Sequence, residues 1–234
     1  MEWTEKLLRD IVEWDVSTWR KAIFCWDRRI DGLPGGAAGR RALEIGARGG
    51  GVTMYLARKG FDCVCSDRGE TFADAKRLHA EYGVSDRVAY ADADAAALPF
   101  EDAGFDVVAF KSVLGSVGKN RQDEKIDAAM AEALRVLKPG GMLLFAENLK
   151  ATRVHLYLRR RLNRWGSAWN YLSLERMRAL LAPLEELELH TYGFWGCFWK
   201  DHPLTRAADA LCCRRNPSRR HYMCYGAGTK PETK

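Results

Sequence analysis

The sequence predicts an α/β protein built on a doubly wound, mostly parallel β-sheet. Between residues 41 and 148, short apolar segments alternate with amphipathic ones, as in repeated βαβ units. The short segments are apolar at nearly every position, which is typical of strands that helices cover on both faces. A chain of 234 residues, 47% hydrophobic and 29% charged, is long and apolar enough for such a core.

The elements follow from periodicity and turn residues. Residues 4–30 are expected to form one or two amphipathic helices, and 31–39 a loop rich in Gly and Pro. Strands are expected at 41–46, 61–66, 87–92, 105–110, 141–148, 184–192 and 219–227. Helices are expected at 52–59, 71–82, 121–137, 153–165 and 173–182. The helix at 121–137 is predicted to stop at Lys138-Pro139-Gly140-Gly141, and 228–234 to fray.

Composition excludes several classes of protein. No apolar run approaches the roughly 18 residues of a membrane span, and the N-terminus lacks a signal-peptide pattern, so a cytoplasmic protein is expected. The seven cysteines form no Cys-x-x-Cys pair, so we expect reduced thiols and no metal site. Residues 1–149 carry a net charge of −3 and residues 150–234 of +9, which indicates an anionic partner or substrate, or only a solvated basic surface.

The first strand leads into a glycine-rich turn with Glu44, Gly46, Arg48 and Gly50. The dinucleotide fingerprint would need glycine at position 48, so a nicotinamide oxidoreductase is disfavoured. Glu44 suits a cationic ammonium group better than a pyrophosphate. Asp67 ends the second strand, where an acid can bind ribose hydroxyls, and Asp94 after the third can accept from an adenine amine. The three acids together describe S-adenosylmethionine, although each alone is typical of a helix cap.

Residues 41–148 resemble the core of class I S-adenosylmethionine-dependent methyltransferases of the small-molecule type. The resemblance rests on the order and spacing of four segments: LEIGARGGG, the acid in CSDRG, DAAALPFEDAGFDVV and RVLKPGGMLLFAE. It implies a seven-stranded sheet with an antiparallel last strand, an N-terminal helical lid and a helical insertion after strand five. It also implies S-adenosyl-L-methionine as cofactor and S-adenosyl-L-homocysteine as product.

The resemblance assigns residues to a cofactor site. These are Glu44, Gly46, Ala47, Arg48, Gly50, Asp67, Arg68, Asp94, Ala95, Phe110 and Lys111. Arg48 replaces the middle glycine of the family pattern acid-x-Gly-x-Gly-x-Gly. Three interpretations stay open: the side chain points to solvent, it holds an anionic group, or it abolishes cofactor binding.

Substrate residues are expected at the ends of strands four and five and in the segments around them. Lys111, Ser112, Asn148 and Trp19 are the candidate binding residues, although Lys111 can instead pair with an acid. Glu147 or His155 is the candidate general base, with a helix cap or salt bridge as the alternative for Glu147 and a surface position for His155.

Aromatic and arginine residues are interleaved in the late insertion. Arg159, Arg160, Arg161 and Arg164 lie beside Leu158, Leu162 and Trp165, and a second aromatic group follows at Phe194, Trp195, Phe198 and Trp199. Such residues can stack on bases or sugars, contact a membrane surface peripherally, or form a secondary core over the cofactor site.

The sequence therefore predicts methyl transfer from S-adenosylmethionine to a small-molecule or a lipid- or glycan-linked metabolite, with O-methylation favoured. Alternatives are an RNA methyltransferase, supported by the basic last third, and a catalytically silent partner protein, supported by Arg48. DNA is disfavoured, since no Asn/Asp-Pro-Pro-Tyr motif is present. The expected organisation is a helical cap (1–38), cofactor core (39–150), helical substrate lobe (151–183), C-terminal strands (184–227) and tail (228–234).

Overall fold

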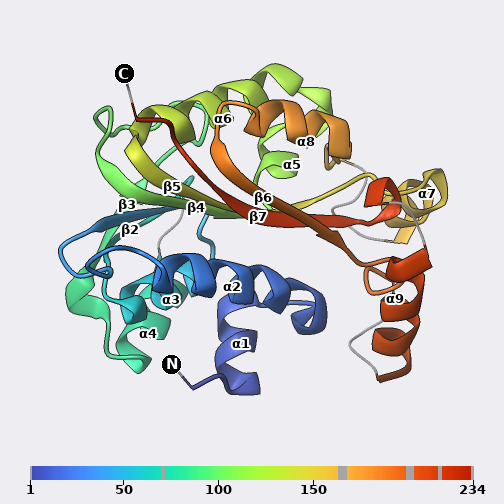
Figure 1. The fold of residues 1–234 in the computed structure, drawn as a ribbon, viewed down its shortest axis with the longest axis horizontal. Coiled ribbons are helices and arrows are strands. Elements are labelled where there is room, and N and C mark those ends of the chain that lie inside the picture. The colour runs from blue at the N-terminus through green and yellow to red at the C-terminus, as the bar shows by residue number, and fades with distance from the viewer. Residues whose placement is uncertain (1, 70–71, 163–167, 199–202, 216–217, 233–234) are drawn as a thin grey trace.

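A twisted β-sheet lies between two layers of helices (Figure 1). The computed structural model describes residues 2–69, 72–162, 168–198, 203–215 and 218–232. Within this part of the chain the sheet has seven strands in the order β3-β2-β1-β4-β5-β7-β6. They are β1 (Arg41–Ile45), β2 (Asp62–Asp67), β3 (Val88–Asp92), β4 (Phe105–Lys111), β5 (Leu137–Asn148), β6 (Glu185–Tyr192) and β7 (Met223–Thr229).

The predicted fold class is confirmed. Strands β1 to β5 pair in parallel, and β7 runs antiparallel to both of its neighbours, β5 and β6. The strand order reverses between β1 and β4, because the chain crosses from β3 back over the sheet. Ligands in such sheets bind beyond the carboxyl ends of the strands at this reversal.

Helices cover both faces of the sheet and bury a separate apolar cluster on each. One face carries α1 (Glu5–Val12), α2 (Val16–Asp31), α3 (Gly51–Lys59) and α4 (Ala73–Glu81). The other carries α5 (Leu114–Val117), α6 (Asp123–Val136) and α8 (Leu174–Leu181). Helices α7 (Arg153–Leu162) and α9 (Pro203–Arg215) lie at the right-hand end in Figure 1. Short 3₁₀ turns occupy Ser85–Arg87, Lys119–Arg121 and Ser218–Arg220.

The N-terminal helices are part of the core as well as a cap. Thr4 begins α1 by accepting a hydrogen bond from the Leu7 N–H at 3.1 Å, a standard N-cap. Helix α2 packs across β5 and β7, and the fully buried Trp26 donates its indole N–H to the Gly226 carbonyl at 3.0 Å. The N-terminal segment that was expected to form a lid therefore also covers this face of the sheet.

Several boundaries differ from the sequence-based expectation. Helix α6 ends at Val136, and Leu137 is already extended, so Pro139 and Gly140 lie within β5 rather than in a helix cap. Gly140 has the expected positive φ of 71° but uses it in the strand, where its N–H donates to the Lys230 carbonyl. This pairing with the C-terminal segment replaces the helix stop.

The C-terminal region also departs from expectation. Strand β7 continues to Thr229, and the Lys230 ammonium donates to the carbonyls of Leu134 and Leu137 at 2.7 Å. Residues 228–230 are therefore fixed by strand pairing and hydrogen bonds, and do not fray as expected. Helix α9 was not anticipated, because its apolar residues lack a clear helical stripe. The predicted helix at 153–165 is described as far as Leu162, and Arg164 and Trp165 lie outside the described residues.

Replacing Trp26 with alanine tests whether α2 is part of the hydrophobic core or a lid that can detach from it. The substitution removes a fully buried ring and its hydrogen bond, so the free energy of unfolding should fall by about 3–5 kcal/mol. Denaturant titration measures this, with Phe24→Ala, on the same helix but 39% exposed, as the matched control. The control should lose less than about 1 kcal/mol. Equal small losses would show that α2 does not pack as described.

Candidate functional site

The turn between β1 and α3 is held from inside the core. Glu44 is buried, and its Oε2 accepts hydrogen bonds from the backbone N–H and the hydroxyl of Thr53, both at 2.6 Å. A Cβ on Gly46 would lie 2.6 Å from Val113, and one on Gly50 would lie 2.7 Å from His79. Both glycines have positive φ, so this turn requires glycine for space as well as for conformation.

Arg48 keeps the turn despite replacing a glycine. Its φ is 47°, a left-handed conformation that costs a non-glycine residue roughly 1 kcal/mol. Its backbone N–H donates to Asp67 Oδ2 at 2.7 Å, which anchors the turn to the end of β2. Its guanidinium lies 3.7 Å from the Glu13 carboxylate and 5.1 Å from the Trp14 ring. The side chain therefore turns toward α1 and remains mostly exposed.

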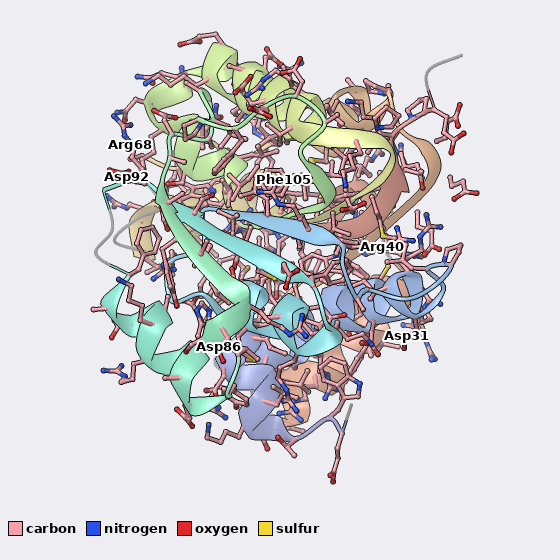
Figure 2. The ribbon with its side chains drawn as sticks, turned by 90° about the vertical axis from the view of Figure 1, so that its left-hand side faces the viewer. Asp31, Arg40, Arg68, Asp86, Asp92 and Phe105 are labelled. Carbon is pink, nitrogen blue, oxygen red and sulfur yellow. The ribbon has the colours of Figure 1, made fainter. Side chains whose placement is uncertain are left out.

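The acids after β2 and β3 converge at one edge of the sheet. Asp67 pairs with Asp92 across the two strands, and Figure 2 shows Asp92 beside Arg68, with Asp86 at the opposite end of β3. Asp67 Oδ1 accepts the Arg68 N–H at 2.7 Å. Asp94 accepts the Ala96 N–H at 3.0 Å, and the Arg68 guanidinium lies 3.5 Å from it. These carboxylates keep further lone pairs for ligand donors.

A cavity of about 980 Å³ opens at the carboxyl ends of the strands. Many residues predicted for the site line it: Trp19, Gly46, Arg48, Asp67, Arg68, Asp94, Ala95, Ser112 and Asn148. The others do not: Glu44, Ala47, Gly50, Phe110, Lys111, Glu147 and His155. Asn148 donates to the Ser112 hydroxyl at 2.7 Å, so these two form one polar group on the wall.

Ala47 and Phe110 belong to the scaffold behind this wall. Both are nearly fully buried, and the Ala47 N–H donates to the Ser66 carbonyl at 2.9 Å. Trp19, by contrast, reaches the cavity from α2, with the Trp14 ring packed edge-on at 5.9 Å.

Lys111 is a buried structural cation. Its ammonium donates to the Val12 carbonyl at 3.2 Å and lies 3.5 Å from the centre of the Trp14 ring. Burial lowers its pKa to about 8, while the Glu13 and Glu44 carboxylates act in the opposite direction. Burial raises the pKa of Glu44 to about 8. The ammonium therefore contacts a backbone carbonyl and an aromatic ring, and Lys111 neither lines the cavity nor forms an ion pair among the described residues.

Glu147 caps a helix instead of facing the cavity. It is fully buried, Oε2 accepts the N–H groups of Val113 and Leu114 at 2.8 and 2.7 Å, and Oε1 accepts that of Asn148 at 2.8 Å. Burial raises its pKa to about 7, and the backbone donors oppose that shift. With Oε2 bonded to backbone N–H groups at the start of α5, Glu147 fits the helix-cap alternative and does not line the cavity.

His155 is buried rather than exposed, and it does not line the cavity. Its ring nitrogens lie 2.6 Å from the Thr152 hydroxyl and 2.6 Å from the Phe194 carbonyl, and the rings of Phe194 and Phe198 pack on it. Burial lowers its pKa. These aromatic contacts agree with the secondary-core interpretation for this part of the insertion. Trp199 lies outside the described residues.

His79 is a supporting residue that sequence reasoning missed. Its Nε2 lies 2.9 Å from the Gly50 carbonyl and its Nδ1 2.7 Å from the Tyr90 hydroxyl, so it braces the glycine turn against α4. A lone histidine on a helix carries no distinguishing signal in a sequence. Arg159, Trp169, Tyr171 and Tyr222 also line the cavity and were not assigned to the site.

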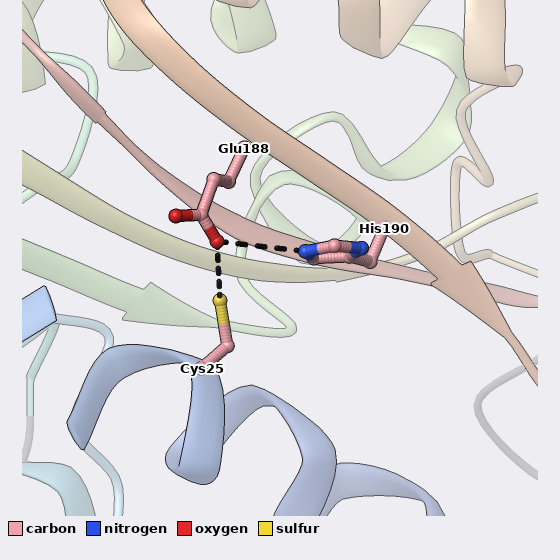
Figure 3. Close-up of side chains that lie close together, drawn as sticks. All are labelled: Cys25, Glu188 and His190. Atoms are coloured by element: carbon pink, nitrogen blue, oxygen red, sulfur yellow. Dashed lines mark hydrogen bonds and ion pairs between the residues drawn. The ribbon is translucent and has the colours of Figure 1, made fainter. Parts of the chain in front are cut away.

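A second cluster of polar side chains lies away from the cavity, between α2 and β6. In Figure 3 Cys25 and His190 both approach Glu188, at 3.7 and 3.5 Å from its Oε2. Their ligand atoms lie within 4.8 Å of one another, as a metal site would require. Arg28 and Arg29, however, already pair with Glu188, and burial raises the pKa of the Cys25 thiol. The thiol and the carboxylate of this cluster therefore already have partners within the protein.

Glu147→Gln should destabilise the fold. The amide would direct an NH₂ group at a backbone N–H that now donates to a carboxylate oxygen, so the free energy of unfolding should fall by about 1–3 kcal/mol. Denaturant titration checks this against Glu101→Gln, a change at an exposed position. A loss no larger than that of the control would argue against the capping role.

His79 should make stability depend on pH. Burial holds its pKa below the ordinary 6.5, so the unfolded chain binds more protons once the pH falls through that value. Its contribution is therefore present above about pH 6.5 and lost as the pH falls below it. Unfolding free energies between about pH 5 and 8 should show the difference between wild type and His79→Gln shrinking on acidification. A constant difference would contradict this assignment.

Residues 43–145 match the methyltransferase domain family. The chain is 36% identical over 110 residues to demethylmenaquinone methyltransferase of Clavibacter sepedonicus, covering 47% of this chain and 42% of that protein. It is 36% identical over 131 residues to a ubiquinone/menaquinone biosynthesis C-methyltransferase of Pseudomonas fluorescens, covering 54% and 49%. The chain thus spans about half the length of these curated relatives.

The fold itself is shared over nearly the whole chain. The structure of Haemonchus contortus phosphoethanolamine N-methyltransferase 2, in complex with phosphomonomethylethanolamine and S-adenosylhomocysteine, aligns with a TM-score of 0.61 at 18% identity. The alignment covers 92% of this chain and 53% of that one. Residues 43–145 are therefore similar to the methyltransferase domain family, and the chain as a whole shares the fold of solved methyltransferase structures.

Proposed function

We propose that the protein transfers the methyl group of S-adenosylmethionine to a small molecule held in the 980 Å³ cavity. One observation carries this proposal: Gly46 of the turn after β1, Asp67 and Asp94 all line the same cavity. The turn leaves no room for a side chain at Gly46, while both acids retain acceptor capacity. These features fit a ligand with a ribose and an amine-bearing base.

In this proposal, different residues bind different parts of the cofactor. Asp67 is our candidate for binding the ribose hydroxyls, and Asp94, with Ala95 beside it, for accepting from the adenine amine; all three residues line the cavity. Glu44 acts through the turn that it braces. When bound, the cofactor supplies an activated methyl group on its sulfonium, so the protein's main task is to align the acceptor and exclude water.

The acceptor end of the cavity is lined by Trp19, Ser112, Asn148, Trp169 and Tyr171. We favour an oxygen acceptor, which needs a base for its proton. Asp15 is our candidate for that base, because it lines the cavity and accepts a hydrogen bond from the Tyr222 hydroxyl. Its left-handed φ of 42° is a strained conformation of the kind that clusters at functional sites.

A lipid-linked acceptor is supported by the exposed side chains near the cavity rim. Leu162 lines the cavity yet is 68% exposed, and Val154 and Tyr157 on the same helix are exposed as well. Arg160 and Arg161 lie between them in the sequence and are also exposed. An apolar and basic helix at the mouth suits an acceptor presented from an anionic membrane surface. No helix in the described ranges is long and apolar enough to cross a membrane.

Calorimetric titration with S-adenosylmethionine tests the cofactor site. The wild type should bind, and Asp67→Asn should bind about tenfold more weakly or worse, because an amide cannot accept both backbone N–H groups and the ligand hydroxyls. Asp86→Asn, at the far end of β3 in Figure 2, is the matched control and should bind like the wild type. A folded wild type that binds neither S-adenosylmethionine nor S-adenosylhomocysteine would overturn the proposal.

A further inference from the structure

A buried arginine in the cavity has no charge partner among the residues that the structure describes. Arg159, on α7, is only 2% exposed and lines the cavity wall. Its Nη2 donates to the carbonyls of Leu149 and Lys150 at 2.5 and 2.8 Å. Its Nε and Nη1 have no hydrogen-bond partner among the described residues, although neither reaches solvent. Three of its five N–H groups are therefore unused.

The surroundings of Arg159 do not neutralise it. No ion pair joins it to a carboxylate in the described part of the chain. The groups that act on its charge are Tyr171, Cys197 and Tyr222, with the Tyr171 ring centre 4.0 Å from the guanidinium carbon. Burial lowers its pKa, as expected for a cation without a counter-ion. Burying a charge of this kind is strongly unfavourable unless a group of opposite charge pairs with it.

A second unused donor lies on the same cavity wall. The indole N–H of Trp169 is inaccessible to solvent and has no hydrogen-bond partner within the described ranges. Trp169 packs directly on Gly115, where any side chain would collide with it, and its ring lies 6.5 Å from that of Tyr171. The Tyr171 ring thus packs against the Arg159 guanidinium and lies near the Trp169 ring, and all three residues line the cavity. Two independent buried donors indicate a missing acceptor.

We infer that Arg159, Trp169 and Tyr171 form a carboxylate-binding subsite, and that the molecule methylated in this cavity carries a carboxylate. The second part of this inference rests on the proposed function. One cation matches one negative charge, and the three guanidinium N–H groups and the indole N–H suit the four lone-pair positions of a carboxylate. A phosphate dianion would leave a net negative charge buried in the same place. The aromatic rings favour a flat or apolar body on the ligand.

The subsite is tested with small aromatic probes. Calorimetric titration of the full chain with benzoate should show binding, whereas benzamide, of the same shape without the charge, should bind about tenfold more weakly or worse. Equal affinities would overturn the inference, as would the absence of benzoate binding at millimolar concentration. Tighter binding of phenyl phosphate than of benzoate would overturn the assignment of a carboxylate.

Variants separate the subsite from general damage to the fold. Arg159→Gln should weaken benzoate binding by about tenfold or more, and Arg160→Gln, its exposed neighbour on α7, should leave it unchanged. Arg159→Lys keeps the charge but offers fewer donors, so it should fall between the two. Unchanged benzoate binding by a folded Arg159→Gln variant would show that the guanidinium serves only the carbonyls of Leu149 and Lys150.

A parallel titration with S-adenosylhomocysteine keeps the two proposals apart. Arg159→Gln should bind it like the wild type, because the acids expected to hold it are on β2 and after β3. Failure of the wild type to bind S-adenosylhomocysteine would overturn the proposed function while the benzoate result still decides the subsite. Loss of benzoate binding alone in the variant would support the subsite directly.

Discussion

The bond between the Glu44 carboxylate and Thr53 is the constraint on which the cavity depends. It joins the carboxyl end of β1 to the first turn of α3 from inside the core. The distance that the intervening loop must span is therefore fixed. That loop must then use the positive φ angles of Gly46, Arg48 and Gly50. The same geometry aims the Arg48 N–H at Asp67, which connects the ends of β1 and β2.

Buried ionisable side chains recur along this end of the sheet, and each holds a segment of backbone by hydrogen bonds. Glu44 and Glu147 hold the starts of α3 and α5, Lys111 holds the end of α1, and Arg159 holds the segment after β5. Such groups are costly to bury, and they persist because their bonds to N–H and carbonyl groups offset much of that cost. Arg159 differs from the other three in leaving donors unused beside the cavity.

The sequence predicts the sheet well because β1, β2, β4 and β5 are apolar runs that are largely buried on both faces. It predicts the direction of strand-end side chains poorly. Asp67 and Glu147 both stand near the carboxyl ends of apolar strands. Asp67 lines the cavity, whereas Glu147 accepts backbone N–H groups at the start of α5. Arg159 stands in a run of arginines, and only the packing of α7 decides that it is buried while Arg160 is exposed. These distinctions are set by tertiary contacts, which periodicity does not encode.

The position of β7 has a consequence for synthesis of the chain. Because β7 lies between β5 and β6, the two strands that it joins have no direct contact in the sheet. A ribosome releases β6 before β7, so β6 has no neighbour to pair with until β7 has emerged. During that interval the edge of β5 is an open template for other strands. Pairing of β7 is therefore the step that both covers the edge of β5 and brings β6 into the sheet.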